Sequence, residues 1–227
     1  MIQAQRVSKI YTRSGARVRA LADVDLTVER GDFLIIHGSS GSGKTTLLLT
    51  LGGMLRPTSG AVLFQGTDIY SLTTGKRAEY RRRHLGFMFQ KFFLVPYLTA
   101  SDNIRFPLVL RGTPAGSQER VREVAERLRI DQRLNHLPAQ LSVGEQQRVA
   151  MARAIVAGPD VILADEPTGN LDRENRGILA QFLRDENRRG RTVVVVTHDD
   201  DLIRLGNRNI QLVAGRLDGP RGDDRES

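Results

Sequence analysis

One glycine-rich segment restricts the possible folds of this chain more than any other feature, and it reads Gly38-Ser39-Ser40-Gly41-Ser42-Gly43-Lys44-Thr45-Thr46. It follows the continuous apolar run 33–37, which has the length of a buried strand, and it leads into the apolar stretch 45–51, which is typical of a helix. A strand, a glycine loop and a helix in this order form the phosphate-binding loop of α/β nucleotide-binding domains. The segment therefore predicts an α/β fold with a nucleotide at the carboxyl end of a strand.

The residue types in this loop suit a triphosphate. Glycines at 38, 41 and 43 allow backbone N–H groups to converge on phosphate oxygens, and the following helix directs its positive end at them. We expect Lys44 to bridge the β- and γ-phosphates and the Thr45 hydroxyl to coordinate Mg²⁺. ATP and Mg²⁺ are therefore the predicted cofactors, and all nine residues 38–46 are predicted to line the nucleotide site.

A second segment ends in two carboxylates, and it reads Val161-Ile162-Leu163-Ala164-Asp165-Glu166-Pro167. The apolar residues predict a buried strand, so Asp165 and Glu166 should lie at the sheet edge where α/β folds bind ligands. We expect Asp165 to hold Mg²⁺ and Glu166 to polarise the water that attacks the γ-phosphate. An acidic pair that only caps a neighbouring helix is the alternative, and the phosphate loop earlier in the chain makes it the weaker one.

Strand-like and helix-like stretches alternate along the chain. Further strands are predicted at 24–28, 61–64 and 192–197, with a helix around 178–183, and this alternation favours a mostly parallel sheet. The stretch from 90 to 159 is predicted to be mostly helical. Within it, the pattern over 118–128 places four apolar side chains on one helix face: Val121, Val124, Ala125 and Leu128.

Composition narrows the class of protein. The chain has 227 residues, 40% hydrophobic and 26% charged, which suits one globular domain. It has no cysteine, no run long enough to cross a bilayer and no apolar leader, so we expect a cytoplasmic protein. Its net charge of +8 could attract nucleic acid or anionic lipid. The basic clusters lack interleaved aromatic residues, so a solvated surface is favoured and a nucleic-acid partner is not expected.

A third segment resembles a family signature. Leu141-Ser142-Val143-Gly144-Glu145-Gln146-Gln147-Arg148 is similar to the signature motif of ATP-binding cassette (ABC) ATPases. Other matches stand in the family's order: Tyr11 resembles the aromatic that stacks on adenine, Gln90 the Q-loop glutamine, 169–172 the D-loop and His198 the switch histidine. The signature departs from the usual form, because Val143 replaces a glycine and Glu145 a glutamine.

The resemblance implies a fold and a division of the chain. It implies a P-loop NTPase (RecA-like) core with a mostly parallel sheet, an N-terminal antiparallel β portion and an inserted helical subdomain. We expect a single domain over 1–217, with the nucleotide-binding core at about 1–89 and 160–217 and the helical subdomain at about 90–159. The polar tail 218–227 is expected to be disordered.

The resemblance also implies how the site works. In the family, two subunits form a head-to-tail dimer, so Ser142, Gly144 and Glu145 of one subunit would close on the ATP held by the other. His198 would contact the γ-phosphate and orient water together with Glu166. Gln90 would take part in catalysis and complete the metal site with Thr45 and Asp165. Each of these three roles rests on the family match, since a lone histidine or glutamine at a strand end is more often structural.

The stretch 87–100 is similar to the group of ABC ATPases that serve lipoprotein release, macrolide efflux and cell division. In that group the ATPase drives a membrane partner that has few spans. Five of the chain's twelve aromatic residues lie in this stretch: Phe87, Phe89, Phe92, Phe93 and Tyr97. We expect Phe87 and Phe89 to lie on a strand and join the core. The loop after it, with Phe92, Phe93, Leu94 and Tyr97, is expected to dock a permease near Gln90–Tyr97.

These observations lead to one expected function and to named alternatives. We expect an ATPase subunit of an ABC export or mechanotransmission complex, a homodimer held at the inner face of the cell membrane by its permease. A soluble ABC ATPase that acts on nucleic acid and a division-type regulatory subunit with low turnover are the alternatives. A P-loop kinase is disfavoured by the signature and D-loop matches. The cargo depends on the permease, so the sequence leaves it open.

Overall fold

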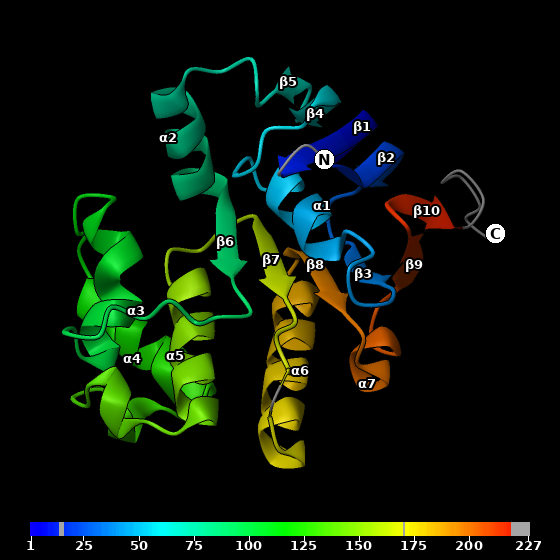
Figure 1. Ribbon diagram of the computed structural model, residues 1–227. Helices are drawn as coiled ribbons and strands as arrows, with labels where there is room; N and C mark the ends of the chain where they lie inside the picture. The colour runs from blue at the N-terminus through cyan, green and yellow to red at the C-terminus, as the bar shows by residue number, and fades with distance from the viewer. Residues whose placement is uncertain (14–15, 170, 219–227) are drawn as a thin grey trace.

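The chain folds into two β-sheets and a group of helices (Figure 1). The computed structural model describes residues 1–13, 16–169 and 171–218. The N-terminal sheet has the strand order β2-β1-β4-β5 with antiparallel pairing throughout. Its strands are β1 (Ile2–Arg13), β2 (Ala16–Val28), β4 (Ser59–Phe64) and β5 (Thr67–Asp68).

The second sheet carries the nucleotide-loop strand at its centre. Its order is β10-β9-β3-β8-β7-β6, and all its pairs are parallel except β10 with β9. Because β3 and β7 both flank β8, the two strands that carry the predicted site residues end at the same edge. The strands are β3 (Phe33–His37), β6 (Leu85–Met88), β7 (Val161–Asp165), β8 (Thr192–Thr197), β9 (Arg208–Val213) and β10 (Arg216–Asp218).

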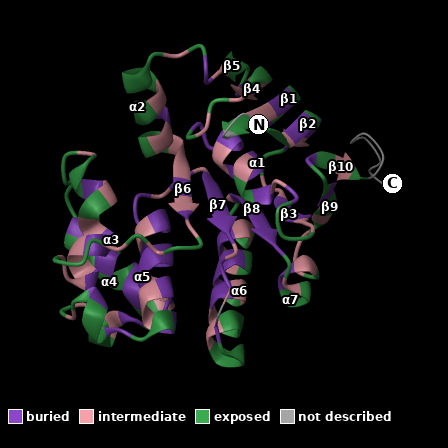
Figure 2. Cartoon of the chain, viewed as in Figure 1, coloured by how far each residue is buried: buried purple, intermediate pink, exposed green. Residues whose placement is uncertain are grey.

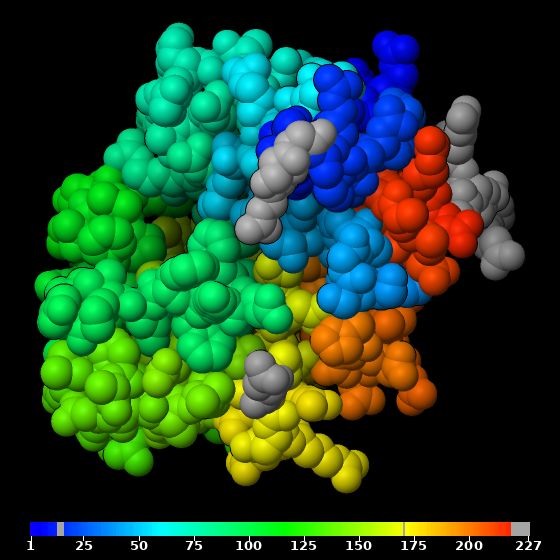
Figure 3. Space-filling view, viewed as in Figure 1, coloured from blue at the N-terminus to red at the C-terminus, as the bar shows by residue number. Residues whose placement is uncertain are grey.

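The helices fall into two groups along the chain. Between β6 and β7 lie α3 (Ala100–Val109), α4 (Ser117–Arg127), α5 (Val143–Ile155) and two 3₁₀ turns, Asp131–Arg133 and Pro138–Gln140. Figure 3 shows this helical region on one side of the molecule, beside the strand-bearing region. The other helices are α1 (Lys44–Leu51), α2 (Thr74–His84), α6 (Arg173–Arg188) and α7 (Asp200–Ile203).

Alternating side chains of the parallel sheet build two separate cores. Ile35, Ile162 and Val195 face the core that includes α3, α4, α5 and α6. Leu34 and Val194 face the opposite core, which α1 and the antiparallel sheet complete. The central strands β3, β7 and β8 are consequently buried on both faces (Figure 2). Burial on both faces explains why they read as continuous apolar runs rather than alternating ones.

The predicted fold class is confirmed, and most predicted elements are found. The four apolar residues of the pattern at 118–128 are all buried, as expected for one face of α4. None of the helices in the described residues is long and apolar enough to cross a membrane.

Two local predictions are wrong. Phe89 lies just past the end of β6 rather than on it, although its ring still stacks on Phe87 at 4.4 Å between centroids. Asp218, expected to begin the tail, pairs with Gln211 in the β10–β9 ladder. Leu94 lies on the loop after β6, as expected, and packs against the helical core. Residues 219–227 lie outside the described residues.

Candidate nucleotide site

The glycine loop joins β3 to α1 in a conformation that its sequence requires. Gly43, the N-cap of α1, has φ of 105°, a left-handed value that favours glycine. A Cβ at this position would lie 2.3 Å from the carbonyl oxygen of Ala20 on β2. The first sheet therefore packs directly against the loop, and any larger residue at 43 would force the two apart.

Polar groups of this loop converge on its interior. The Lys44 Nζ donates to the carbonyl oxygens of Gly38 at 2.7 Å and of Ser39 at 3.0 Å. The Ser42 hydroxyl is buried and has no hydrogen-bond partner within the chain. Since a buried hydroxyl is costly to leave unpaired, these groups fit a bound polyanion that would accept their hydrogen bonds. Ser40 and Gly41 lie exposed on the same loop, and Thr46 lies in the first turn of α1.

Two of the three predicted magnesium ligands, Thr45 and Asp165, meet in the structure. Thr45 Oγ1 donates to Asp165 Oδ1 at 3.0 Å, across 120 residues of sequence. Burial raises the pKa of the Asp165 carboxyl, the hydrogen bond from Thr45 opposes this rise, and the neighbouring Glu166 adds to it. A divalent cation here would offset the cost of the buried carboxylate, and oxygen ligands of this kind suit Mg²⁺.

Glu166 is held in an uncommon backbone conformation directly after β7. Its φ is 46°, and such values in non-glycine residues cluster at functional sites. Its Oε2 accepts a hydrogen bond from Thr197 Oγ1 at 3.1 Å, and its Oε1 lies 2.9 Å from Nδ1 of His198. The Glu166 side chain is 11% exposed, whereas that of His198 is 74% exposed. The pair thus offers a fixed carboxylate beside an accessible imidazole, the arrangement needed to orient a water molecule.

The signature residues lie at the start of α5, and their hydrogen bonds are made locally. Ser142 is the N-cap: its hydroxyl accepts from the Glu145 backbone N–H at 3.2 Å, while the Ser142 N–H donates to Glu145 Oε2 at 2.8 Å. Arg133 Nε donates to the other oxygen of Glu145 at 2.9 Å. Partial burial acts to raise the pKa of Glu145, but the bonds from Ser142 and Arg133 outweigh it and lower that pKa.

Gly144 has a packing role that the sequence motif does not reveal. A Cβ on this buried residue would lie 2.7 Å from the side-chain carbon Cγ of Asn175. Asn175 in turn donates its side-chain N–H to Asp172 at 2.7 Å, and Arg148 donates to its side-chain oxygen. These contacts connect the signature helix to the end of the predicted D-loop, of which Asn170 lies outside the described residues.

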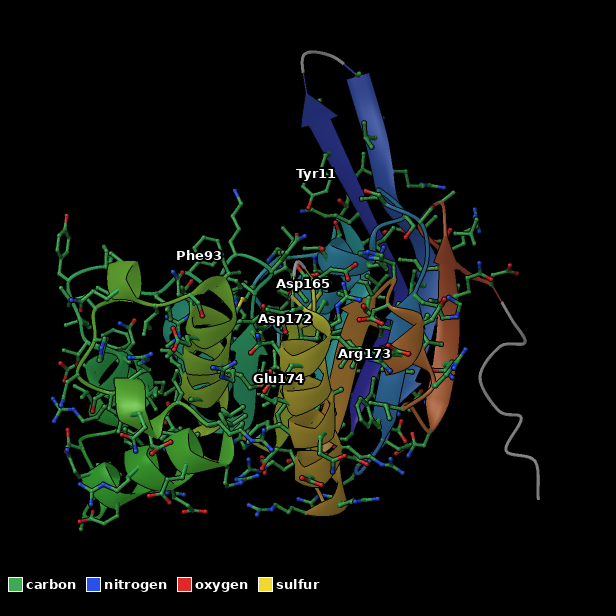
Figure 4. All side chains as sticks on the ribbon, turned by 90° about the horizontal axis from the view of Figure 1, so that it is seen from below. Tyr11, Phe93, Asp165, Asp172, Arg173 and Glu174 are labelled. Carbon is green, nitrogen blue, oxygen red and sulfur yellow. The ribbon has the colours of Figure 1, made fainter. Side chains whose placement is uncertain are left out.

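Not all predicted residues come together within one chain. Over the described residues, the hydrogen bonds that involve the side chains of Ser142 and Glu145 go to each other and to Arg133, and none goes to the 38–46 loop. Gln90 is exposed two residues past β6, whose register partner β7 leads to Asp165. Tyr11 lies on β1, 40% exposed, with the Lys9 ammonium 5.4 Å from its ring centroid. Figure 4 shows Tyr11, Asp165 and Asp172 on their separate elements.

Sequence reasoning overlooked several residues that shape the site. Thr197 donates a hydrogen bond to Glu166. It could have been predicted as a site residue, because it stands next to His198 at the end of a strand. Asn175 follows Asp172 by three residues, a spacing typical of a helix cap. Arg133 carries no such signal, because only the folding of the helical region brings it to Glu145.

Comparison with known proteins agrees with this geometry. The sequence profile of a family described as "ABC transporter" matches residues 21–169. The chain is 40% identical to the ABC transporter ATP-binding protein YtrE of Bacillus subtilis over 96% of this chain and 97% of that protein. It is 42% identical to the macrolide export ATP-binding/permease protein MacB of Rhodopseudomonas palustris, over 99% of this chain but only 35% of MacB.

Solved structures show the same fold. The dimeric structure of MJ0796, described as a bacterial ABC transporter cassette, superposes with a TM-score of 0.93 at 39% identity, covering 96% of this chain and 97% of that one. A second MJ0796 structure, a dimeric post-hydrolysis state bound to ADP and Pi, superposes with a TM-score of 0.92, also at 39% identity and with the same coverage.

Proposed function

The chain belongs to the ABC transporter family of ATP-binding proteins, and on this premise we propose that it binds and hydrolyses ATP to power a membrane export or mechanotransmission complex. One observation carries the proposal. The hydrogen bond between Thr45 and Asp165 joins the phosphate loop to the strand-end carboxylates, directly beside the Glu166–His198 pair. Phosphate-binding, metal-binding and water-orienting groups therefore share one sheet edge.

The loop residues hold the nucleotide in this mechanism. Backbone N–H groups of 38–46 and the Lys44 ammonium bind the β- and γ-phosphates, after Lys44 exchanges its contacts with Gly38 and Ser39 for phosphate oxygens. Thr45 and Asp165 would hold Mg²⁺, and Gln90, two residues past β6, would complete its ligands. The ion would neutralise charge on the phosphates. The exposed ring of Tyr11 stacks on the adenine.

Glu166 acts as the general base. Its carboxylate accepts a proton from the water that attacks the γ-phosphate, and the bond from Thr197 keeps it oriented. His198 donates to Glu166 through Nδ1, so its other ring nitrogen is left to face the γ-phosphate. The bond from water oxygen to phosphorus forms as the bond from phosphorus to the ADP oxygen breaks.

The signature completes the site of a second copy. Ser142 and Glu145 hydrogen-bond to each other and to Arg133, and Gly144 packs against Asn175 of α6. Ser142 stays exposed, so it is available to the ATP on another subunit. A head-to-tail homodimer places two nucleotides between two loops and two signatures. ATP binding closes the dimer and hydrolysis reopens it.

A permease contacts the loop 89–99 in this proposal. Phe93 is 63% exposed and Tyr97 is 89% exposed, and the C-terminal half of α3, at the end away from this loop, exposes Phe106, Val109 and Leu110. An apolar surface of this kind suits a helix of a membrane partner, which would hold the protein at the cytoplasmic face of the membrane. In this proposal the nucleotide-binding core comprises 1–89 and 160–217, and the helical subdomain comprises 90–159. This division separates the nucleotide from the contact with the permease.

Substitution of Glu166 by Gln tests the proposed chemistry. The amide cannot accept the proton of water, so ATP hydrolysis should fall by about 100-fold or more, while the protein still binds MgATP. Trapped ATP should convert the monomer into a dimer, measured by size-exclusion chromatography with light scattering.

Lys44→Ala is the matched control, because it removes phosphate binding and should give neither dimer nor hydrolysis. Normal hydrolysis by Glu166→Gln would show that another group is the base. A monomer that persists at saturating MgATP would contradict the dimer mechanism.

A further inference from the structure

The loop 89–99 between β6 and α3 has no helix or strand of its own, yet the protein holds it in one shape. Asn103 of α3 is fully buried, and within the part of the chain that the structure describes its side chain bonds only to this loop. Its Oδ1 accepts from the Val95 N–H at 2.8 Å, and its amide N–H donates to the carbonyls of Val95 at 3.1 Å, Leu98 at 2.9 Å and Thr99 at 3.1 Å. The far half of the loop is therefore fastened to α3.

The near half is fastened by Arg153 of α5. Its guanidinium donates to the carbonyl of Phe93 at 2.7 Å and to the carbonyl of Phe92 at 2.5 Å. Among the described residues, no carboxylate forms a salt bridge with Arg153, so backbone carbonyls alone satisfy its charge. Arg153 is half-buried, and its charge-assisted hydrogen bonds to two successive carbonyls are stronger than bonds from a neutral donor.

The backbone that Arg153 holds is in an uncommon conformation. Phe93 has φ of 47°, a left-handed value that is strained in a non-glycine residue of this size. Its ring meets the ring of Phe89 edge-on, with centroids 5.3 Å apart, and remains at the surface (Figure 4). The bonds from Arg153 thus fix the direction in which the most exposed phenylalanine of the loop points.

Helix α5 connects the signature to the hydrogen bonds between Arg153 and the loop 89–99. Ser142 is its N-cap, and Arg153 lies in its last turn. Thirteen helical residues span roughly 20 Å. Because a packed helix moves as a rigid rod, a displacement of Ser142 toward a nucleotide must also displace the Arg153 guanidinium and the carbonyls bound to it.

We propose that Arg153 is the positioning residue that makes the signature helix α5 and the loop 89–99 move as one body, so that nucleotide capture at Ser142 changes the surface presented by Phe93. This inference rests on the proposed function, since it assumes that the signature moves when ATP is bound. The role of Arg153 is to carry the movement to the loop through two carbonyl bonds.

A tryptophan placed in the loop reports the movement. The chain contains no tryptophan, so Phe93→Trp in the Glu166→Gln protein gives a single fluorophore at the held backbone. Adding MgATP should shift its emission as the dimer closes. The additional substitution Arg153→Gln should abolish that shift, with nucleotide affinity changed by less than about twofold, because Arg153 is remote from the loop 38–46.

Two further variants distinguish a loss of coupling between α5 and the loop 89–99 from a general loss of structure. Arg153→Lys keeps the charge and one donor, so it should restore part of the shift. Arg122→Gln removes an exposed arginine of the same helical region and should leave the shift complete. If Arg153→Gln does not fold, Arg153→Lys decides: a reduced shift at unchanged affinity supports the inference, and a complete shift overturns it.

The remaining outcomes are also decisive. An emission shift that persists in Arg153→Gln overturns the inference, and so does a missing shift in protein that keeps Arg153 and forms the ATP-bound dimer. In both cases the proposed function stands. If the Glu166→Gln protein forms no dimer with MgATP in size-exclusion chromatography, the proposed function fails and the inference fails with it.

Discussion

Single residues of the signature serve local structure and the distant nucleotide at once. Gly144 leaves room for the Asn175 side chain, and Glu145 caps α5 while pairing with Arg133. Neither contact is visible in the motif itself. Substitutions here must therefore be interpreted first as changes in folding and only then as changes in phosphate binding.

Gly144→Ala should destabilise the protein by about 1–3 kcal/mol, because the added methyl group overlaps the Asn175 side chain. Asn175→Ala removes the obstacle, so the double variant should be more stable than the sum of the two single effects predicts. Urea denaturation of the four proteins gives the coupling energy. Strictly additive effects would show that the two side chains do not compete for space.

Glu145→Gln should lower stability at neutral pH and have little effect in acid. The folded protein lowers the pKa of Glu145, so its carboxylate adds stability above the ordinary value of about 4.3 and loses it as pH falls through the folded pKa. Glutamine can still accept the bond from the Ser142 N–H, but it carries no charge to pair with Arg133. The free energy of unfolding should therefore fall by about 0.5–1 kcal/mol. Thermal melts at pH 7 and pH 4 test this, and a difference that grows in acid would contradict it.

Among the helices, ion pairs of one buried carboxylate join α6 to the helical region. Glu186 of α6 is fully buried and forms ion pairs with Arg127 at the end of α4 and with Arg191 ahead of β8. The Arg127 guanidinium also lies 4.8 Å from the ring centroid of Phe182 on α6. One carboxylate thus holds three segments together and neutralises the arginines between them.

Glu186→Gln should destabilise the protein by about 3–5 kcal/mol, since it leaves Arg127 and Arg191 without a buried counter-charge. The matched control is Glu174→Gln, an exposed substitution on the same helix, which should change stability by less than about 0.5 kcal/mol. Chemical denaturation measures both. Equal effects of the two substitutions would mean that burial of Glu186 contributes nothing.

At the scale of the whole molecule, the catalytic apparatus is divided between two surfaces. The loop 38–46 and the carboxylates share one sheet edge, whereas Ser142 bonds only within the helical region. A site completed by a second copy has a distinctive consequence. Defects on opposite surfaces of two subunits can compensate in a mixed dimer.

Lys44→Ala and Ser142→Arg should each be inactive alone, and an equimolar mixture should hydrolyse ATP. The Ser142→Arg subunit contributes an intact loop and the Lys44→Ala subunit an intact signature, so each mixed dimer has one working site. Because neither variant closes a dimer with itself and each mixed dimer has one working site of two, the mixture should reach at most about half of the wild-type rate. Steady-state ATPase measurements on the mixture test this, and a mixture as inactive as its parts would place the complete site within one chain.

Elements whose patterns are local could be predicted from the sequence, and those that depend on distant partners could not. The β8 range 192–197 and the strand–loop–helix unit follow from short-range propensity and turn chemistry. Strand β1 was not predicted, because bulges around Arg6 and Val7 interrupt its alternation. Helix α2 buries only Tyr80, so it lacks the apolar periodicity by which helices are found.

The phosphate loop, the strand-end carboxylates and the family could be recognised from the sequence alone, because each depends on neighbouring residues whose backbone geometry is set locally. The groups that folding brings together could not be recognised in this way: Thr45 with Asp165, Glu166 with His198, Gly144 with Asn175, and Arg153 with the loop 89–99. Those contacts follow from the order of strands in the sheet and the packing of α3 to α6. Both arise from burying apolar faces that are far apart along the chain.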